Sequence, residues 1–362
     1  MIKVAPLILK LREMGGKAIL VNTGQHADLL RPLFDLFHIQ PDYDLSVMSP
    51  GQPLNTLVAN ILERLDPLLE KEQPDYVIVQ GDIASALAGA LAAFNRKIPV
   101  GHVEAGLRSG NASSPFPEEM NRRLVTQIAT LHFAATEHNR QTLLRQGVPP
   151  EMIHVTGNSV VDALQHTLKK TEPGPEISRL RDLVAGRNLV LLTTHRRENF
   201  GDAMRTHLRS LRGFAEAHPE LCIIFPLHPN PNVREAAKQE LDGCDQIILT
   251  PPIGYADFVH LLADAWLIVS DSGGIQEEAA SLGKPILVLR ENTERPEGVQ
   301  VGVARLVGSN PAALSELLTD AVADKGWFQV AAQAEKVYGD GLTAERISRI
   351  LLGDQRSKVG SA

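Results

Sequence analysis

Short runs of aliphatic and β-branched residues alternate with amphipathic segments along nearly the whole chain. The runs have the length of buried strands, and the segments between them carry apolar residues at helical spacing. Apolar strands that alternate with helices form parallel sheets covered on both faces, so the pattern predicts an α/β protein with doubly wound sheets. Strands are expected at residues 18–21, 76–80, 99–103, 131–134, 153–156, 189–193, 222–226, 247–249, 266–270, 285–289 and 304–307. Helices are expected at residues 2–13, 54–69, 84–94, 119–129, 257–263 and 274–281.

Two such series follow one another, separated by the segment 169–176, which contains Pro and Gly. A chain of 362 residues is long enough for two domains. We expect an N-terminal Rossmann-like domain over residues 1–158 and a second one over 159–341. Residues 342–362 are expected to form a last helix and a tail, with the helix packing back on the N-terminal domain.

The first predicted element is the helix at residues 2–13, and no predicted strand precedes it. In a doubly wound domain the first strand lies centrally, and the turn after it carries ligand-binding groups. Without that strand, backbone groups of the neighbouring strands have no partner in the middle of the sheet.

Composition and charge narrow the class of protein. Hydrophobic residues make up 43% and charged residues 22% of the chain, and the net charge of −7 argues against nucleic acid or an anionic membrane as partner. No apolar run approaches the roughly 18 residues of a membrane span, and the first residues lack the features of a signal peptide. Cys222 and Cys244 have no metal-ligand spacing, which favours a reduced setting. We therefore expect a cytoplasmic enzyme without a metal.

Gly273 and Gly274 follow the predicted strand at residues 266–270. Ligands of open α/β sheets bind beyond the carboxyl ends of the strands. Glycines at that point let backbone N–H groups approach an anion at the start of the next helix. Glu278, about one turn further, is placed to accept hydrogen bonds from a ribose diol. An ordinary helix N-cap with a glycine turn is the alternative explanation.

His195 follows the predicted strand at residues 189–193 and stands beside Arg196 and Arg197. A histidine next to two arginines suits phosphate stabilisation or proton transfer. A solvated loop of charged side chains is the alternative. His228 also follows a predicted strand, and a turn histidine is the simpler interpretation there.

Three acidic residues, Asp82, Glu104 and Glu118, are expected at or near one edge of the first sheet. Carboxylates that face a cleft are suited to general acid/base catalysis. The alternatives are a helix N-cap for Asp82 and a favourable first-turn charge for Glu118. With the glycine-rich helix start of the second domain, these carboxylates indicate an enzyme acting on a sugar nucleotide between two domains.

Five motifs occur in one order: Gly101-His-Val-Glu104-Ala-Gly-Leu-Arg108, Pro117-Glu118-Glu119-Met-Asn121-Arg122, Thr194-His195-Arg196-Arg197-Glu198, Asp271-Ser-Gly-Gly-Ile-Gln-Glu-Glu278 and Thr293-Glu-Arg295-Pro-Glu. Together they resemble the bacterial non-hydrolysing UDP-N-acetylglucosamine 2-epimerases, over essentially the whole chain. The resemblance implies the GT-B architecture, with the active site in the cleft between two Rossmann-like domains and UDP bound by the second. It implies reversible conversion of UDP-N-acetylglucosamine to UDP-N-acetylmannosamine. The implied route is anti elimination of UDP to a 2-acetamidoglucal, followed by re-addition of UDP with protonation of the opposite face of C2.

The resemblance also implies roles for single residues, no redox cofactor or metal, and a homodimer that binds a UDP-sugar. The roles are acid/base catalysis for Asp82, Glu104 and Glu118; diphosphate contact and leaving-group assistance for His195; backbone phosphate binding for Ser272, Gly273 and Gly274; ribose binding for Glu278; contact with uracil for Phe258 and Ile253; and a charged lining for Lys3 and Arg295.

The sequence departs from the family in two places. The family has a strand and a Gly-Thr-Arg-Pro-Glu loop directly before a segment like residues 2–6, and our hypothesis is that the natural polypeptide begins upstream of Met1. The intact mass of the protein from its native source tests this, and a mass matching Met1 would contradict it. Gln25 fits one glutamine of the family's allosteric site, but Asp28 and Gly51 stand at its other two positions. We therefore expect little activation by UDP-N-acetylglucosamine, measured as initial rates on UDP-N-acetylmannosamine with and without trace activator.

Four alternatives remain at the level of sequence. A GT-B glycosyltransferase shares the fold and the UDP site but releases UDP only with an acceptor. A hydrolysing epimerase releases free N-acetylmannosamine. An epimerase of a modified UDP-2-acetamido sugar shares the chemistry. A non-catalytic sugar-nucleotide sensor does not explain the retained carboxylates and His195.

Overall fold

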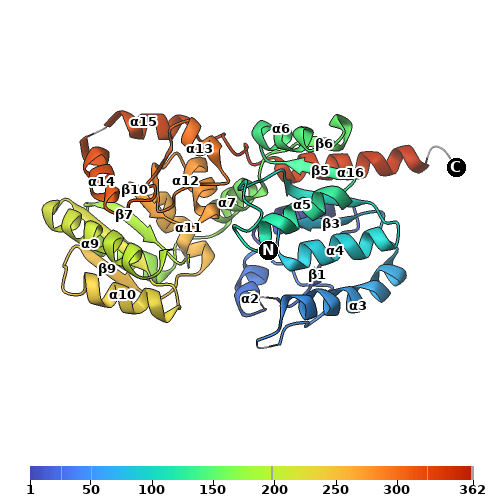
Figure 1. The fold of residues 1–362 in the computed structure, drawn as a ribbon, viewed down its shortest axis with the longest axis horizontal. Helices are drawn as coiled ribbons and strands as arrows, with labels where there is room; N and C mark the ends of the chain where they lie inside the picture. The colour runs from blue at the N-terminus through green and yellow to red at the C-terminus, as the bar shows by residue number, and fades with distance from the viewer. Residues whose placement is uncertain (26, 50, 197–198, 324, 360–362) are drawn as a thin grey trace. The chain divides into compact units, whose positions relative to one another are not determined.

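The computed structural model describes residues 1–25, 27–49, 51–196, 199–323 and 325–359, and it folds into two compact α/β units (Figure 1). Unit 1 comprises Met1–Ala163 with Gly339–Ala362, and unit 2 comprises Leu164–Tyr338. The predicted α/β class with parallel sheets is confirmed, because every strand pair within both units is parallel.

The predicted separator 169–176 lies inside unit 2, because the chain divides earlier, within helix α7 (Ser159–Lys170). Two contacts tie this segment to unit 2. The backbone N–H of Gly174 donates to Asp257 Oδ1 at 2.8 Å, and the Thr171 hydroxyl lies 3.0 Å from His260 Nε2. Pro and Gly therefore mark a turn before the next helix here.

Unit 1 contains a four-stranded parallel sheet and a separate two-stranded one. Its elements are α1 (Ala5–Glu13), β1 (Val21–Asn22), α2 (Ala27–Leu36), β2 (Tyr43–Asp44), α3 (Leu54–Glu72), β3 (Val77–Gln80), α4 (Ala84–Asn95), β4 (Val100–Ala105), α5 (Glu118–Ile128), β5 (Leu131–Ala134), α6 (Glu137–Arg145), a 3-10 turn (Pro150–Met152), β6 (Ile153–Val155) and α16 (Thr343–Val359). The strand orders are β3-β4-β5-β6 and β1-β2. No described strand pairs with the other edge of β1 or of β3.

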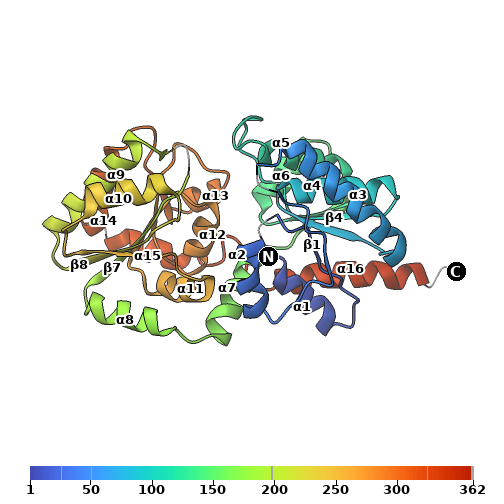
Figure 2. The same ribbon diagram turned by 90° about the horizontal axis from the view of Figure 1, so that it is seen from below.

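Helices cover both faces of the strands of unit 1, as Figure 2 shows with α3, α4 and α5 on one face and α1 and α16 on the other. Helix α16 is far from α1 in the sequence but packs against it, through a cluster that contains Leu7, Ile347 and Leu351. A second cluster joins α3 to α4 and includes Val21 of β1 and Val77 of β3 at its margin.

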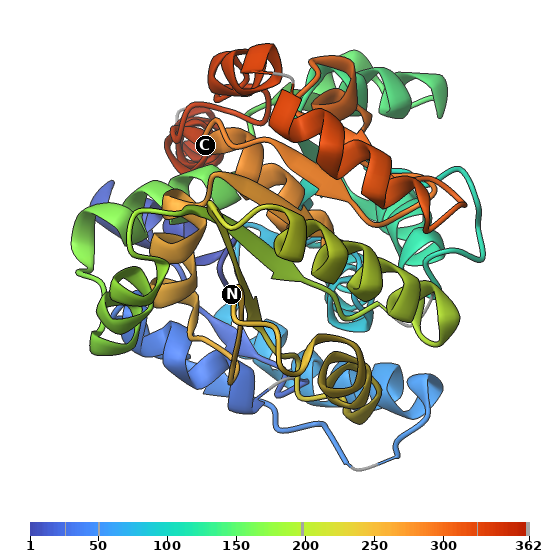
Figure 3. The same cartoon turned by 90° about the vertical axis from the view of Figure 1, so that its left-hand side faces the viewer.

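Unit 2 has one six-stranded parallel sheet in the order β12-β11-β10-β7-β8-β9. Its elements are α8 (Pro175–Val184), β7 (Asn188–Thr193), α9 (Asp202–Ala217), β8 (Leu221–Pro226), α10 (Pro231–Leu241), β9 (Ile247–Thr250), α11 (Tyr255–Asp264), β10 (Leu267–Ser270), α12 (Gly273–Ser281), β11 (Ile286–Val288), α13 (Pro296–Gln300), β12 (Ala304–Leu306), α14 (Ala313–Ala323) and α15 (Lys325–Gln333). Figure 3 shows the strands between helices on both sides. The central residues of β7 and β8 are fully buried on both faces of the sheet, as the continuous apolar runs predicted.

Candidate active site

The strand order of unit 2 reverses beside β7, which pairs with β8 on one side and β10 on the other. In open α/β sheets, such a switch point opens a crevice for ligands beyond the carboxyl ends of the two strands. The loop after β7 begins with Thr194 and His195, and the loop after β10 begins with Asp271. Arg197 and Glu198, singled out in the sequence, lie outside the described residues.

The N-terminus of α12 lies at this switch point. Ser272 is the N-cap residue in extended conformation, and its side chain makes no capping hydrogen bond. A Cβ atom on Gly273 would lie 2.5 Å from Nη1 of Arg295, whereas a Cβ atom on Gly274 would meet nothing within 4 Å. The guanidinium therefore packs on one glycine, while the open space beside the other leaves room for an anion at the helix start.

Arg295 is held in place by a buried ion pair. Its Nε donates to Glu277 Oε1 at 2.6 Å, and both side chains are buried. Nearby, Arg290 Nη1 donates to Glu294 at 2.9 Å. Burial acts to raise the pKa of Glu294, but the hydrogen bonds and charge of Arg290 outweigh it and lower the pKa to about 2. Ion pairs with buried carboxylates therefore hold the two arginine side chains near the α12 N-terminus in place.

Glu278 lies on α12 and is buried. The hydroxyl of Tyr255 donates to its Oε1 at 3.0 Å, and burial together with the Glu278 charge raises the pKa of Tyr255, which keeps the phenol a donor. Tyr255 and Phe258 are neighbours one turn apart on α11, directly after Ile253. The predicted ribose residue Glu278 and the predicted uracil residue Phe258 thus lie on two helices of unit 2 that the Tyr255–Glu278 hydrogen bond links, and Ile253 lies in the loop before α11.

In unit 1, Glu104 stands at an irregular point of β4. Its φ of 67° is in the left-handed region, and the register with β5 shifts between Val103 and Ala105. Side-chain-bearing residues rarely adopt this conformation, which costs free energy and is found at functional sites. Lys3 forms an ion pair with Glu104 Oε1, and Gln80 Nε2 donates to Oε2 at 2.5 Å.

Asp82 lies next to Glu104 at the same sheet edge. A Cβ atom on Gly81 would lie 3.6 Å from Glu104 Oε2, which places the Glu104 carboxylate against the residue before Asp82. Asp82 Oδ2 accepts from Arg122 Nε at 2.7 Å and Nη2 at 2.6 Å. Both contacts are to the same oxygen, so the ion pair holds Oδ2 of Asp82 against Arg122.

Glu118 is the first residue of α5 and is half-buried. The first turn of α5 reaches the Asp82 loop, because Asn121 Nδ2 donates to the Asp82 carbonyl at 2.8 Å. The structure thus brings Asp82, Glu104 and Lys3 together and places the turn that carries Glu118 beside them. Gln80 and Arg122 were not predicted; Arg122 stands in a quoted motif, but its contact with Asp82 depends on tertiary structure.

Gln25, the predicted allosteric residue, accepts a hydrogen bond from the Ser85 hydroxyl at 2.8 Å, at the start of α4. The Asp28 side chain lies outside the described part of the structure. Within the described residues, no group of three or more His, Cys, Asp or Glu side chains is arranged to hold a metal ion. No helix in the described part of the chain combines the length and apolarity needed to cross a membrane.

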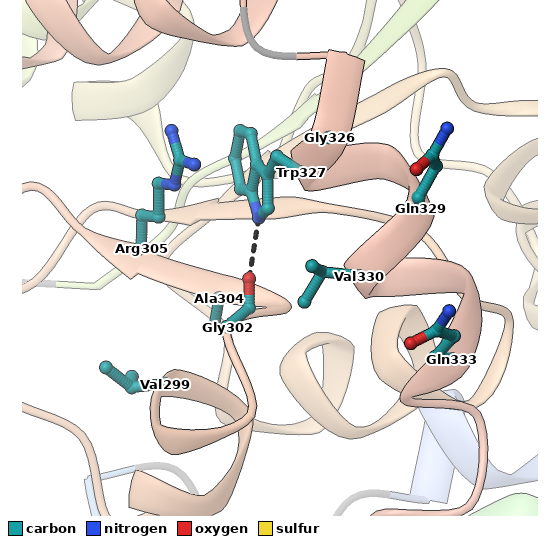
Figure 4. Close-up of a pocket in the computed structure, with 9 residues that line it drawn as sticks. All are labelled: Val299, Gly302, Ala304, Arg305, Gly326, Trp327, Gln329, Val330 and Gln333. Carbon is teal, nitrogen blue, oxygen red and sulfur yellow. Dashed lines mark hydrogen bonds between the residues drawn. The ribbon is translucent and has the colours of Figure 1, made fainter.

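A surface cavity of about 670 Å³ lies elsewhere in unit 2, between α13, β12 and α15 (Figure 4). Trp327 Nε1 donates to the Gly302 carbonyl at 2.7 Å, and the Arg305 guanidinium lies 4.0 Å from the centroid of the indole ring. The cavity is at the amino end of β12, whereas the loops with His195 and Asp271 leave the carboxyl ends of the sheet. None of the predicted site residues lines it.

Two Rossmann-like units, one with an open helix N-terminus at its switch point and one with carboxylates at its strand ends, define an enzyme of the GT-B type. The family model for UDP-N-acetylglucosamine 2-epimerase matches residues 10–352, and the chain belongs to this family.

Individual relatives agree with this membership. The chain is 44% identical to the UDP-N-acetylglucosamine 2-epimerase of Yersinia pestis over 360 residues, which cover 98% of this chain and 96% of that protein. The enzyme of Neisseria meningitidis bound to UDP-GlcNAc matches with a TM-score of 0.89 and 40% identity, over 97% of this chain and 96% of that one. The Methanocaldococcus jannaschii enzyme in complex with UDP-GlcNAc and UDP matches with a TM-score of 0.81 and 34% identity, over 97% and 96% of the two chains.

Proposed function

We propose that the protein interconverts UDP-N-acetylglucosamine and UDP-N-acetylmannosamine without hydrolysis. A carboxylate removes the C2 proton, and the electron pair of the C2–H bond becomes the second bond of C1=C2. The C1–O bond breaks, and UDP leaves with the electron pair of that bond, which gives 2-acetamidoglucal. UDP then adds back to C1, and a second carboxylic acid protonates the opposite face of C2. Atoms balance because the UDP that leaves is the UDP that returns.

The observation that carries the proposal is the placement of Glu104 at the end of β4. Its left-handed backbone and its contacts with Lys3 and Gln80 hold the carboxylate against Gly81, next to Asp82. Inversion by proton removal and return needs two carboxyl groups that act on opposite faces of the ring. Asp82, Glu104 and Glu118 are our candidates for these two groups.

Unit 2 holds the UDP group in this proposal. Backbone N–H groups of Gly273 and Gly274 bind phosphate, supported by the open space at Gly274 and by the Arg295 guanidinium. The third predicted donor, the Ser272 N–H, instead donates to the Ser270 hydroxyl at 3.0 Å. His195 contacts the departing diphosphate, Glu278 holds the ribose, and Phe258 lies against uracil near Ile253. In unit 1, Lys3 contributes to the charged lining of the site through its ion pair with Glu104.

We also propose a cytoplasmic homodimer. Apolar side chains of the packed helices α4 and α5 are well exposed, with Phe94 at 60%, Met120 at 41% and Leu124 at 44%. Cys222 and Cys244 are buried free thiols, in keeping with a reducing compartment. Light scattering should give twice the chain mass of 39.4 kDa, and a Leu124→Glu variant should give the single-chain mass.

Proton NMR of UDP-N-acetylglucosamine with the enzyme in heavy water tests the reaction. The expected result is deuterium at C2 in both epimers, with UDP-N-acetylmannosamine formed and no free sugar accumulating. Free N-acetylmannosamine would identify a hydrolysing enzyme, and UDP release only with an added acceptor would identify a glycosyltransferase. No exchange and no turnover, with tight UDP binding, would identify a sensor. Deuterium exchange only with a modified UDP-2-acetamido sugar would show that this modified sugar is the substrate.

A further inference from the structure

A buried carboxylate, Asp271, joins the two loops of the switch point in unit 2. The residue is 0% exposed, directly after β10. Its Oδ2 accepts from the Thr194 hydroxyl at 2.7 Å, from the backbone N–H groups of His195 and Arg196 at 3.0 Å each, and from Asn199 Nδ2 at 3.0 Å. Burial acts to raise the pKa of Asp271, but the contact and charge of the His195 ring, followed by the Thr194 hydroxyl and the Arg196 N–H, outweigh it and lower the pKa.

The other carboxylate oxygen faces the His195 ring. Asp271 Oδ1 lies 3.2 Å from His195 Nδ1, and the imidazole stacks on His228 with ring centroids 5.6 Å apart and planes at 24°. The His195 side chain keeps 43% of its surface exposed. A carboxylate oxygen this close to Nδ1 repels a lone pair on that nitrogen and so favours the tautomer with the proton on Nδ1, which leaves the lone pair on Nε2.

We propose that Asp271 is a positioning residue that holds His195 in the Nδ1–H tautomer with Nε2 directed away from the protein interior. His195 then takes a proton from solvent at the exposed Nε2, and the imidazolium donates this proton to a phosphate oxygen as the leaving group departs, which returns the ring to the Nδ1–H tautomer. The catalytic part rests on the proposed epimerase function, whereas the tautomer does not.

Selective ¹⁵N labelling of histidine and long-range ¹H–¹⁵N spectra test the tautomer, with a His195→Gln variant to assign the signals. The wild-type protein is expected to show a protonated Nδ1 and an unprotonated Nε2 at His195. Asp271→Asn should move the population toward the Nε2–H form. Its kcat should fall by about 10- to 100-fold, while the dissociation constant of UDP changes by less than about threefold.

Thr194→Val is the matched control, because it removes one donor to Asp271 and leaves the imidazole contact. It should keep the Nδ1–H tautomer and most of kcat. A wild-type spectrum with the proton on Nε2 would overturn the proposal without any variant, and so would an Asp271→Asn protein with unchanged tautomer and kcat. Equal effects of Thr194→Val and Asp271→Asn would show that Asp271 only holds the loop. If the wild-type protein lacks epimerase activity, the proposed function fails and the tautomer is still decided.

Discussion

Gln80 directs one oxygen of Glu104, because its Nε2 donates to Oε2 while Lys3 pairs with Oε1. A hydrogen bond to a charged group contributes roughly 1.5–3 kcal/mol. Gln80→Met keeps the length of the side chain and removes the donor, so kcat for epimerisation should fall by about 10- to 100-fold. Deuterium incorporation at C2 reports the same loss. Gln141→Met, on the exposed face of α6, is the matched control, and equal kcat values for the two variants would contradict the role of Gln80.

Gly106 and Gly110 separate two effects of adding a side chain. Both have positive φ, 90° and 85°, but a Cβ atom on Gly106 would lie 2.4 Å from the Asn139 carbonyl oxygen, whereas one on Gly110 meets nothing within 4 Å. Gly106→Ala should lower the free energy of unfolding by roughly 2–4 kcal/mol, and Gly110→Ala by about 1 kcal/mol from backbone strain alone. Denaturant unfolding of the two variants measures the difference. Similar losses would mean that the chain moves away from Asn139 at little cost.

At the scale of elements, we predict that the N-terminus of α12 binds the phosphates of UDP. Gly274 lies in the first turn of α12 and Gly213 on the exposed face of α9, and a Cβ atom added at either would meet nothing within 4 Å. Alanine at either position should leave the free energy of unfolding unchanged or raise it by up to about 1 kcal/mol. Only Gly274→Ala should weaken UDP binding, by about tenfold or more, because its methyl group covers the N–H groups of the helix start. Calorimetric titration with UDP checks this, and unchanged affinity would place the phosphate elsewhere.

The elements that sequence predicts best are those with a buried apolar run. Strand β5 has the predicted bounds, Leu131–Ala134, whereas β2, Tyr43–Asp44, has no apolar run and was not predicted. The left-handed backbone of Glu104 has no sequence signal, because non-glycine residues rarely adopt it. The Asp271–His195 contact depends on β10 pairing with β7, which local patterns do not encode. The residue types at strand ends predict that a site exists, but the order of the strands in the sheet determines which of these side chains contact one another.

For the whole molecule, three buried histidines predict loss of stability in mild acid. Burial lowers the pKa of His102, His132 and His207 from 6.5 to about 4 in each case. The unfolded chain therefore gains these protons near pH 6.5 and the folded protein only near pH 4. The stability is fully present above pH 6.5 and is lost as the pH falls toward 4, by roughly 3 kcal/mol or less for each histidine. The melting temperature should accordingly fall between pH 7 and pH 4.5.

Variants separate this effect from the titration of carboxylates in the same range. His132→Met fills a site that is 1% exposed with a side chain that takes up no proton, so its melting temperature should fall less over the same interval. His38→Asn is the control, because His38 is exposed and its φ of 51° suits asparagine. If the melting temperature of His132→Met falls with pH as steeply as that of the wild-type protein, the acid sensitivity comes from other groups. The buried Arg290–Glu294 pair contributes little in this window, because the unfolded chain takes up the Glu294 proton only near pH 4.5 and the folded protein near pH 2, so this stability is lost mainly below pH 4.5. Since His102 and His132 belong to unit 1 and His207 to unit 2, both units should lose stability together as the pH falls.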